Sequence, residues 1–479
     1  MTPNLPRHAR TATLVLCALT MAACAPLSPR AGHPDMKAAS LYATEKSFSG
    51  PTAPWPAETW WTAYGDRQLD SLIDEALRGA PNLAVAEARL QRAVAYSQVA
   101  RGATRPQVSA NGSASQQKQS YNYITPSALT PQGWNDYGRA TLDLNWELDF
   151  WGKNRAALAA ATSDAEAARA DVAQARLVLA ASIASTYAEL AREFAALDTA
   201  RAALEVRTKT ADLFRRRYDN GLETLGSVRG VEARRAAAEA EVLAVEERIG
   251  LQRNRLAALM GAGPDRGLQI ARPVIDLSRP VGLPPQVAAD LIGRRPDVTA
   301  ARLRAEAASK RIRQAQAAFY PNVNLMAFAG VQSLGLDNLA RNGSSIGSVG
   351  PAISLPIFDG GRLRGQLNGA EAEYAEAVAN YDRALVQALQ DVADVTVSRN
   401  ALGGQLTKTG EAVDAARAAW RIQNSRYEGG LSTYLDVLSA EDSLLESLRT
   451  LTDLQSRTFT LDVALNRALG GGYSTTTQQ

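Results

Sequence analysis

Few side chains in this 479-residue sequence have the chemistry of a reactive centre, and Cys24 is the clearest. It ends the segment Met21-Ala22-Ala23-Cys24, which resembles a lipobox. In that motif small residues precede a cysteine whose thiol receives a diacylglyceryl group before the leader is cleaved. We therefore expect residues 1–23 to be a lipoprotein signal peptide and Cys24 to be the lipidation site. An ordinary signal peptide with an incidental Cys24 is the alternative.

The leader has the parts that secretion requires. Arg7 and Arg10 form a basic start, and the apolar run from Thr13 to Ala23 is too short to span a bilayer permanently. Ala25, and not an aspartate, follows the cysteine. This fits sorting of a lipoprotein to the outer membrane.

Few other residues of the mature chain could form a disulfide, a metal site or a catalytic group. Cys17 leaves with the leader and His33 is then the only histidine, so no disulfide, Cys/His metal site or His-based triad can form. The 52 Lys+Arg and 49 Asp+Glu balance, which argues against a nucleic-acid partner. Two carboxylates could still act as a catalytic acid and base, but no pattern in the sequence identifies such a pair. We expect no enzyme, no cofactor and no metal.

The mature chain begins with segment 24–60, which is rich in Pro, Ala, Ser and Thr. We predict that this segment is an extended tether. Helices follow up to Ala100. Strands are then predicted at about 105–124 and 137–150, the second with clean alternation. One face is apolar, with Ala140, Leu142, Leu144, Trp146, Leu148 and Phe150. Asp143, Glu147 and Asp149 lie on the other face.

Two long helices are predicted next, at 152–219 and 222–260. The first has no proline and repeats apolar residues every seven positions, at Ile183, Leu190, Leu197 and Leu204. If helical throughout, it is about 100 Å long, at about 1.5 Å per residue. A heptad seam of that length indicates long helices packed side by side at shallow angles.

The same order recurs in the second half, with strands at about 321–333 and 345–358 and helices at 360–428 and 431–469. The motif Arg217 to Thr224 matches Arg426 to Thr433 at an offset of 209 residues, and the heptad phase and helix ends keep step. We infer a duplication. The first repeat spans 61–264, the second 265–470, and 471–479 is a flexible tail.

Four strands cannot close a membrane barrel, because an open edge in lipid leaves backbone groups unpaired. A membrane sheet therefore requires an oligomer, with eight strands for a dimer and twelve for a trimer. A soluble sheet with one wet face is the alternative. The helices are rich in alanine, which favours the wall of a hollow tube over a filled coiled-coil stalk.

Several stretches together resemble the TolC/OprM outer-membrane factors, in the NodT-type lipoprotein branch of RND efflux systems. Trp60 to Leu83 is similar to the first helices of that family. The block from Leu283 to Pro321, which contains Arg294-Arg295-Pro296-Asp297, is similar to its most recognisable internal segment. Phe358-Asp359-Gly360-Gly361 resembles its strand-to-helix turn, and Arg426 to Leu431 its hairpin tip.

The resemblance implies an α+β membrane protein, a homotrimer with a 12-stranded β-barrel and a 12-helix periplasmic α-barrel. It would be lipid-anchored and inserted in the outer membrane of a Gram-negative bacterium, extending into the periplasm. It implies an exit duct that docks a periplasmic membrane-fusion adaptor and serves an inner-membrane RND-type pump that expels drugs or other toxic small molecules. An exit duct for a secreted protein or peptide, or a non-conducting periplasmic scaffold, are the alternatives.

The resemblance also assigns residues. Leu435 matches a constricting apolar ring at the periplasmic gate, with Ser439 where many relatives place an aspartate and Asp436 as the nearest carboxylate. Packing between helices is the alternative for Leu435. The adaptor-docking tips carry Tyr218, Gly221, Leu222, Tyr427, Gly430 and Leu431. Each glycine also suits a tight turn.

Two further predictions concern charged residues. Asp143, Glu147 and Asp149 would face the lumen if Trp146 and Phe150 face lipid, which predicts an interior that favours cations. Ordinary wetting of a polar face is the alternative. In Arg294-Arg295-Pro296-Asp297, a proline at the first helical position beside an acid favours a helix start over a binding site.

Overall fold

The computed structural model describes residues 34–48, 51–275, 282–284 and 287–475. The chain folds into two compact units. In the described residues, the first unit comprises 34–36, Gln91–Ala167 and Ala301–Asn380. The second comprises Lys37–Leu90, Ala168–Ala300 and the chain from Tyr381 onward. Cys24 and the predicted signal peptide lie outside the described residues.

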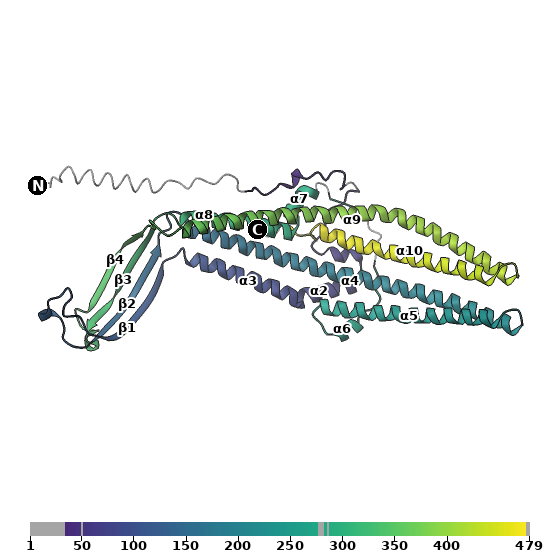
Figure 1. The fold of residues 1–479 in the computed structure, drawn as a ribbon, viewed down its shortest axis with the longest axis horizontal. Coiled ribbons are helices and arrows are strands. Elements are labelled where there is room, and N and C mark those ends of the chain that lie inside the picture. The colour runs from purple at the N-terminus through teal and green to yellow at the C-terminus, as the bar shows by residue number, and fades with distance from the viewer. Residues whose placement is uncertain (1–33, 49–50, 276–281, 285–286, 476–479) are drawn as a thin grey trace. The chain divides into compact units, whose positions relative to one another are not determined.

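The first unit contains one antiparallel sheet, in the order β1-β2-β3-β4 (Figure 1). Its strands are β1 (Gln107–Gln117), β2 (Asn135–Glu147), β3 (Asn322–Leu334) and β4 (Ser345–Ser354). The short helices η3 (Ser127–Leu129) and η4 (Leu336–Asn338) lie in the loops after β1 and β3.

The register of the sheet separates an apolar face from a mainly polar one. Directly opposed residues of antiparallel strands lie on the same face. One row across the sheet is Val108, Leu144, Ala327 and Val349, and the next residues along give Ser109, Asp143, Phe328 and Ser348. The alternation predicted for the second strand is therefore confirmed over β2. Val108, Leu142 and Val349 are 67%, 60% and 75% exposed, so the described residues leave the apolar face largely uncovered.

The strands are shorter than expected. β1 ends at Gln117 and not near residue 124, and β4 ends at Ser354 and not at 358. Pro356 has no N–H to donate to a strand ladder. Asp359 then accepts hydrogen bonds from the backbone N–H groups of Gly361 and Leu363, 3.0 and 2.9 Å, and so begins the next helix.

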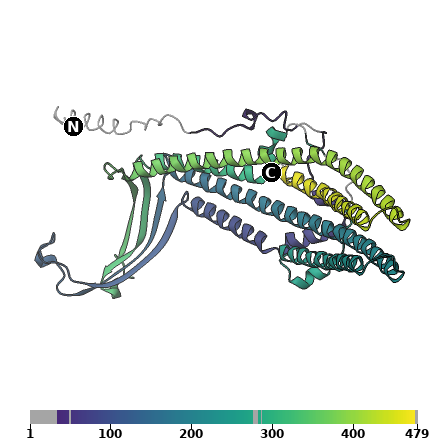
Figure 2. The same ribbon diagram turned by 45° about the vertical axis from the view of Figure 1, so that its right-hand side comes forward.

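The long helices of the chain form two helical hairpins (Figures 1 and 2). The first consists of α4 (Lys153–Asp219) and α5 (Leu225–Leu259), and the second of α9 (Arg362–Glu428) and α10 (Tyr434–Ala468). Both first helices have 67 residues and both second helices have 35. Each bound in one hairpin lies 209 residues from its counterpart, which confirms two strand-strand-long-helix units.

Short helices complete both units. They are α2 (Arg67–Gly79), α3 (Pro81–Gly102), α6 (Pro264–Leu268), α7 (Val287–Arg294) and α8 (Pro296–Ala317), with the 3-10 turns η1 (Ala39–Leu41) and η2 (Trp60–Tyr64). In the first unit, Ile312 of α8 packs against Leu367 of α9. In the second unit, the largest core joins η2 and α2 to α4, α5 and α10.

That core also contains two buried phenol–carboxylate pairs. The Tyr187 hydroxyl donates to Asp66, and the Tyr64 hydroxyl donates to Asp462, both at 2.6 Å. Asp66 also accepts from the backbone N–H groups at the start of α2. These bonds satisfy carboxylates that burial would otherwise penalise.

The segment predicted as a tether is bound to the second unit over much of its length. Thr52 forms a parallel bridge with Leu283. The side chains of Tyr42, Phe48 and Trp55 pack on the apolar cluster of α7, α9 and α10. The described part of this segment is therefore extended but packed.

The Arg294-Arg295-Pro296-Asp297 motif is structural, as favoured from the sequence. Pro296 is the first residue of α8. The Arg295 side chain is 8% exposed, and its guanidinium contacts Asp297 at 2.6 Å and Asp391 at 2.8 Å. These two hydrogen-bonded carboxylates keep the pKa of Arg295 raised despite its burial.

Within the described residues, no helix has both the length and the apolar character that crossing a membrane requires.

The glycines after α10 provide a test of packing in the second unit. Gly471 has φ 58°, and a Cβ there would lie 2.3 Å from Leu177 Cδ1 and 3.2 Å from Trp60 Nε1. We expect Gly471→Ala to lower the free energy of unfolding by about 2–4 kcal/mol, from overpacking and left-handed strain. Thermal unfolding followed by circular dichroism measures this.

Gly404→Ala is the matched control, because Gly404 lies within α9 and a Cβ there would meet no atom within 4 Å. It should raise stability slightly, since alanine favours a helix by about 0.5–1 kcal/mol over glycine. Equal melting temperatures for the two variants would contradict the packing described here.

Candidate gating and docking site at the hairpin ends

The first hairpin turns through Gly221, just after α4 ends at Asp219. Gly221 has φ 74°, a conformation that only glycine adopts without strain. The N–H groups of Gly221 and Leu222 donate to the carbonyls of Tyr218 and Arg217, at 2.9 and 2.8 Å. Thr224 caps α5 by accepting from Ser227 N at 3.1 Å. The turn thus satisfies several of the backbone groups that both helix ends leave open.

The second hairpin repeats this geometry at Gly430, which has φ 76°. The N–H groups of Gly430 and Leu431 donate to the carbonyls of Tyr427 and Arg426, at 3.0 and 2.7 Å. Thr433 caps α10. The turn role of both glycines is therefore observed directly.

Three of the predicted site residues at these ends present apolar surface. Leu222, Leu431 and Leu435 are 65%, 72% and 71% exposed. The alternative for Leu435 was packing between helices. Within a single copy, Leu435 is too exposed for that role. Tyr218 is 36% exposed.

Tyr427 differs from its repeat counterpart Tyr218, because it is only 3% exposed. Its ring stacks on Phe214 with the centroids 5.2 Å apart, and the Arg217 guanidinium covers it at 4.7 Å. Its hydroxyl donates to Glu223. Burial, and then this carboxylate, raise the pKa of Tyr427. The ring belongs to the core of the tip and cannot serve as the docking surface expected of it.

The predicted gate residues beside Leu435 have backbone roles. Asp436 forms a capping box with Thr433, whose N–H and Oγ1 donate to its carboxylate at 2.8 and 2.7 Å. These bonds lower the pKa of Asp436. Ser439 is exposed, and its carbonyl accepts from Ser443 Oγ at 2.9 Å.

Sequence reasoning missed an ionic network that joins the two hairpins. Asp442 on α10 accepts from Arg234 of α5 at 2.8 and 3.1 Å, and from Arg207 of α4 at 3.1 Å. The bond to Asp442 is the main cause of a raised pKa at Arg234. One carboxylate thus bridges both helices of the other hairpin.

Glu441, next to Asp442, is buried at 1% exposure. Its Oε2 accepts from Thr210 at 3.2 Å, whereas its Oε1 lies 3.7 Å from Arg207 Nε, too far for a hydrogen bond. Burial raises the pKa of Glu441, and Arg207 and Thr210 oppose that shift. Its position between Val437 and Leu444, at i+4 and i+7 spacing, was the signal available in the sequence.

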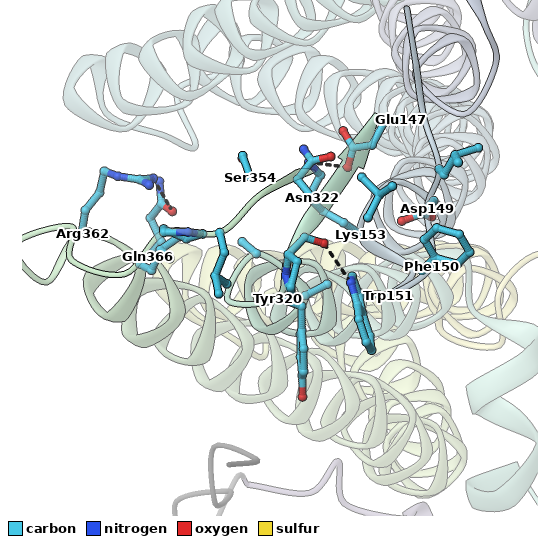
Figure 3. Close-up of a pocket in the computed structure, with 18 residues that line it drawn as sticks. Glu147, Asp149, Phe150, Trp151, Lys153, Tyr320, Asn322, Ser354, Arg362 and Gln366 are labelled. Atoms are coloured by element: carbon cyan, nitrogen blue, oxygen red, sulfur yellow. Dashed lines mark hydrogen bonds and ion pairs between the residues drawn. The ribbon is translucent and has the colours of Figure 1, made fainter. Parts of the chain in front are cut away.

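The three predicted lumen-facing acids lie in the first unit. Asp143 accepts from Asn111 and Thr141 at 2.8 and 2.7 Å. Glu147 forms an ion pair with Lys153 at 2.7 Å (Figure 3). Asp149 lies beyond β2 and accepts from Arg155 N at 2.8 Å, at the start of α4. Two of the three charges are therefore already paired with a cation or a helix start, which weakens the expected preference for cations.

No metal chemistry is indicated in residues 34–48, 51–275, 282–284 and 287–475. They contain no group of three or more His, Cys, Asp or Glu arranged to hold an ion.

Comparison with known proteins agrees with this architecture. The family model described as outer membrane efflux protein matches residues 72–262 and 287–471, one segment in each half of the chain. The chain belongs to the outer membrane efflux protein family. It is an outer-membrane efflux channel of a Gram-negative bacterium and not an enzyme.

Individual relatives of this efflux protein include the multidrug resistance outer membrane protein MdtP of Escherichia coli strain K12. It is 31% identical over 88% of this chain and 87% of its own length. The fusaric acid resistance protein FusA of Burkholderia cepacia is 42% identical over 67% of this chain, and the match spans 61% of that protein. The crystal structure of outer membrane protein VceC of Vibrio cholerae aligns with a TM-score of 0.84 and 51% identity, over 88% of this chain and all of that one.

The ionic network predicts how tightly the ends of this efflux channel are held. We expect Asp442→Asn to raise the conductance of the resting channel, because it removes the charge that holds Arg207 and Arg234. Asp442 is 47% exposed, so the loss is only about 1 kcal/mol, or roughly a fivefold shift in favour of opening. Recording in planar bilayers measures it.

Glu441→Gln is the matched control and should not raise conductance. The raised pKa means that the folded state holds the Glu441 proton more tightly than the unfolded chain does. Acidification through that pKa therefore stabilises the folded state, and a neutral glutamine imitates the protonated form. Equal increases in both variants would show that the network does not hold the hairpins together.

Proposed function

We propose that this chain forms a homotrimeric exit duct, through which a tripartite RND-type pump expels drugs or other toxic small molecules across the periplasm and outer membrane. The observation that carries the proposal is the duplicated strand-strand-hairpin unit, whose sheet exposes an uncovered apolar face. MdtP and FusA are described as resistance proteins for multiple drugs and fusaric acid. Small toxic molecules are therefore favoured over a secreted protein.

Three copies would supply enough strands to close the sheet into a barrel. A four-stranded sheet leaves the outer edges of β1 and β4 without partner strands in the part of the chain that the structure describes. In lipid these backbone groups require strands of other copies, and twelve strands make a closed barrel. The two hairpins of each copy would give a tube of twelve helices.

Leu435 supplies the apolar part of the periplasmic gate in this proposal. Three exposed leucines around an axis would form a narrow constriction that excludes water. Ser439 lies one turn further on, and Asp436 is held by Thr433. The gate therefore depends on apolar closure more than on charge.

The exposed ends of the hairpins are the surface for a periplasmic membrane-fusion adaptor. Leu222 and Leu431 supply apolar contact area, Tyr218 lies beside them, and Gly221 and Gly430 set the turns. Tyr427 supports this surface from within. An acyl group on Cys24 would add a second attachment to the outer membrane.

The subunit number tests the duct directly. Native mass spectrometry of the detergent-extracted mature protein should give a trimer of acylated chains, and these trimers should conduct in planar bilayers. Cys24→Ser should remove the acyl mass and leave the trimer intact. A stable acylated monomer without conductance would exclude the duct, because four strands cannot span lipid.

The gate assignment predicts a leaky variant. Leu435→Ser should raise resting conductance and the entry of antibiotics several-fold, because a hydroxyl allows water into the constriction. Leu243→Ser is the matched control, since Leu243 is 67% exposed on α5, away from the hairpin ends. Unchanged leakage in the Leu435 variant would remove this residue from the gate.

A further inference from the structure

A cavity of about 230 Å³ in the second unit is lined by residues of α4, α5 and α10. Most of its wall comes from α4, and Arg255 of α5 and Arg467 of α10 complete it. Its volume lies below the range of drug-sized sites, about 300–1,000 Å³, so it suits a small ion or a single polar group. The exit duct proposed above gives these residues no role.

Among the described residues, neither arginine of this cavity has an acidic partner. The side chains of Arg255 and Arg467 are exposed, and no hydrogen bond or ion pair joins either guanidinium to the part of the chain that the structure describes. Glu189 is the carboxylate of the lining, and it is already bound to Arg192 at 2.9 Å. Guanidinium groups stay protonated in proteins. The cavity therefore holds two accessible positive charges that are free to bind an anion.

Serine hydroxyls add donors on the α4 side of the cavity. Ser182 and Ser185 are partly exposed, and their Oγ atoms form no hydrogen bond with any described residue. The neighbouring Thr186 differs, because its hydroxyl donates to the Ser182 carbonyl at 2.8 Å. A serine hydroxyl can donate to an anion, and a guanidinium binds phosphate oxygens through its planar fork. Donors on three helices suit the several oxygens of a tetrahedral anion.

The duplication shows that helix packing does not require these arginines. At the offset of 209 residues, Arg467 corresponds to Ala258, and Arg255 corresponds to Ala464. The two serines correspond to aspartates of α9. The hairpin therefore forms with alanine at both arginine positions, and the positive charge at this cavity belongs to one repeat only.

We propose that this cavity binds a small oxyanion of the phosphate class, either inorganic phosphate or the phosphate group of an ester. Arg255 and Arg467 hold its oxygens from α5 and α10, and the serine hydroxyls donate from α4. A bound anion neutralises two like charges that otherwise repel each other. It also links the two hairpins, because α10 then shares one ligand with α4 and α5. The lining residues belong to one copy, so the site does not depend on the trimer.

Isothermal titration calorimetry of the full-length protein in detergent tests the site with inorganic phosphate. Sodium chloride is adjusted to keep the ionic strength constant, because added salt by itself screens exposed charges. The wild type should show saturable phosphate binding that chloride does not reproduce. A parallel titration with glycerol 3-phosphate identifies the source of the phosphate. Tighter binding of the ester indicates an ester as the ligand, and tighter binding of the free ion indicates phosphate itself.

Arg467→Ala should weaken phosphate binding by about tenfold or more, because a hydrogen bond between charged groups is lost. Arg255→Ala should have the same effect. Both variants should fold, since the equivalent positions of the other repeat already carry alanine. Arg457→Ala is the matched control, because Arg457 is also exposed on α10 but lies outside the cavity lining. It should bind phosphate as the wild type does.

Equal affinity of the wild type for phosphate and chloride would overturn the proposal, because it would indicate general screening of surface charge. Equal losses in the Arg467 and Arg457 variants would also overturn it. Subunit number and conductance are measured on the same preparations, by native mass spectrometry and in planar bilayers. Conducting trimers that bind no phosphate would reject only the anion site. Phosphate binding by a non-conducting monomer would reject only the duct.

Discussion

Unpaired backbone groups at the edges of the sheet are the constraint on which the proposed assembly depends. Among the described residues, β1 and β4 each pair with one strand, and the apolar row through Leu144 and Ala327 ends in Val108 and Val349, which are exposed. Lipid covers an apolar face but cannot bond to N–H and C=O groups. A sheet of this kind is stable in a membrane only when other copies continue it. In the proposed trimer, each copy would contribute the four long helices of its two hairpins to the tube.

The hairpin ends combine surfaces of two kinds. Leu222, Leu431 and Leu435 are exposed, whereas Phe214 and Tyr427 form a small core just behind them. Beside that core, Asp442 of the second hairpin contacts two guanidinium groups of the first. These ion pairs are partly solvated, so each contributes little to stability. The hairpin ends are therefore held together by several weak interactions.

Much of the fold could be predicted from the sequence because its signals are local and periodic. The turns at Gly221 and Gly430, the heptad seams and the alternation along β2 each depend on neighbours within a few residues. The bounds of the predicted tether and strands were less accurate. Packing of Tyr42, Phe48 and Trp55 on a distant cluster leaves no periodic trace, and Pro356 ends β4 although apolar residues continue beyond it.

The sequence by itself determined the duplication, the helix ends, the apolar face of the sheet and the family. Only the tertiary structure decided which equivalent residues differ in role. Tyr218 and Tyr427 hold the same repeat position, yet one is 36% and the other 3% exposed, because only Tyr427 meets Phe214 and Glu223. Arg207 and Arg234 lie 235 and 208 residues from Asp442. Contacts over such separations depend on how the hairpins pack, and local sequence does not encode that packing.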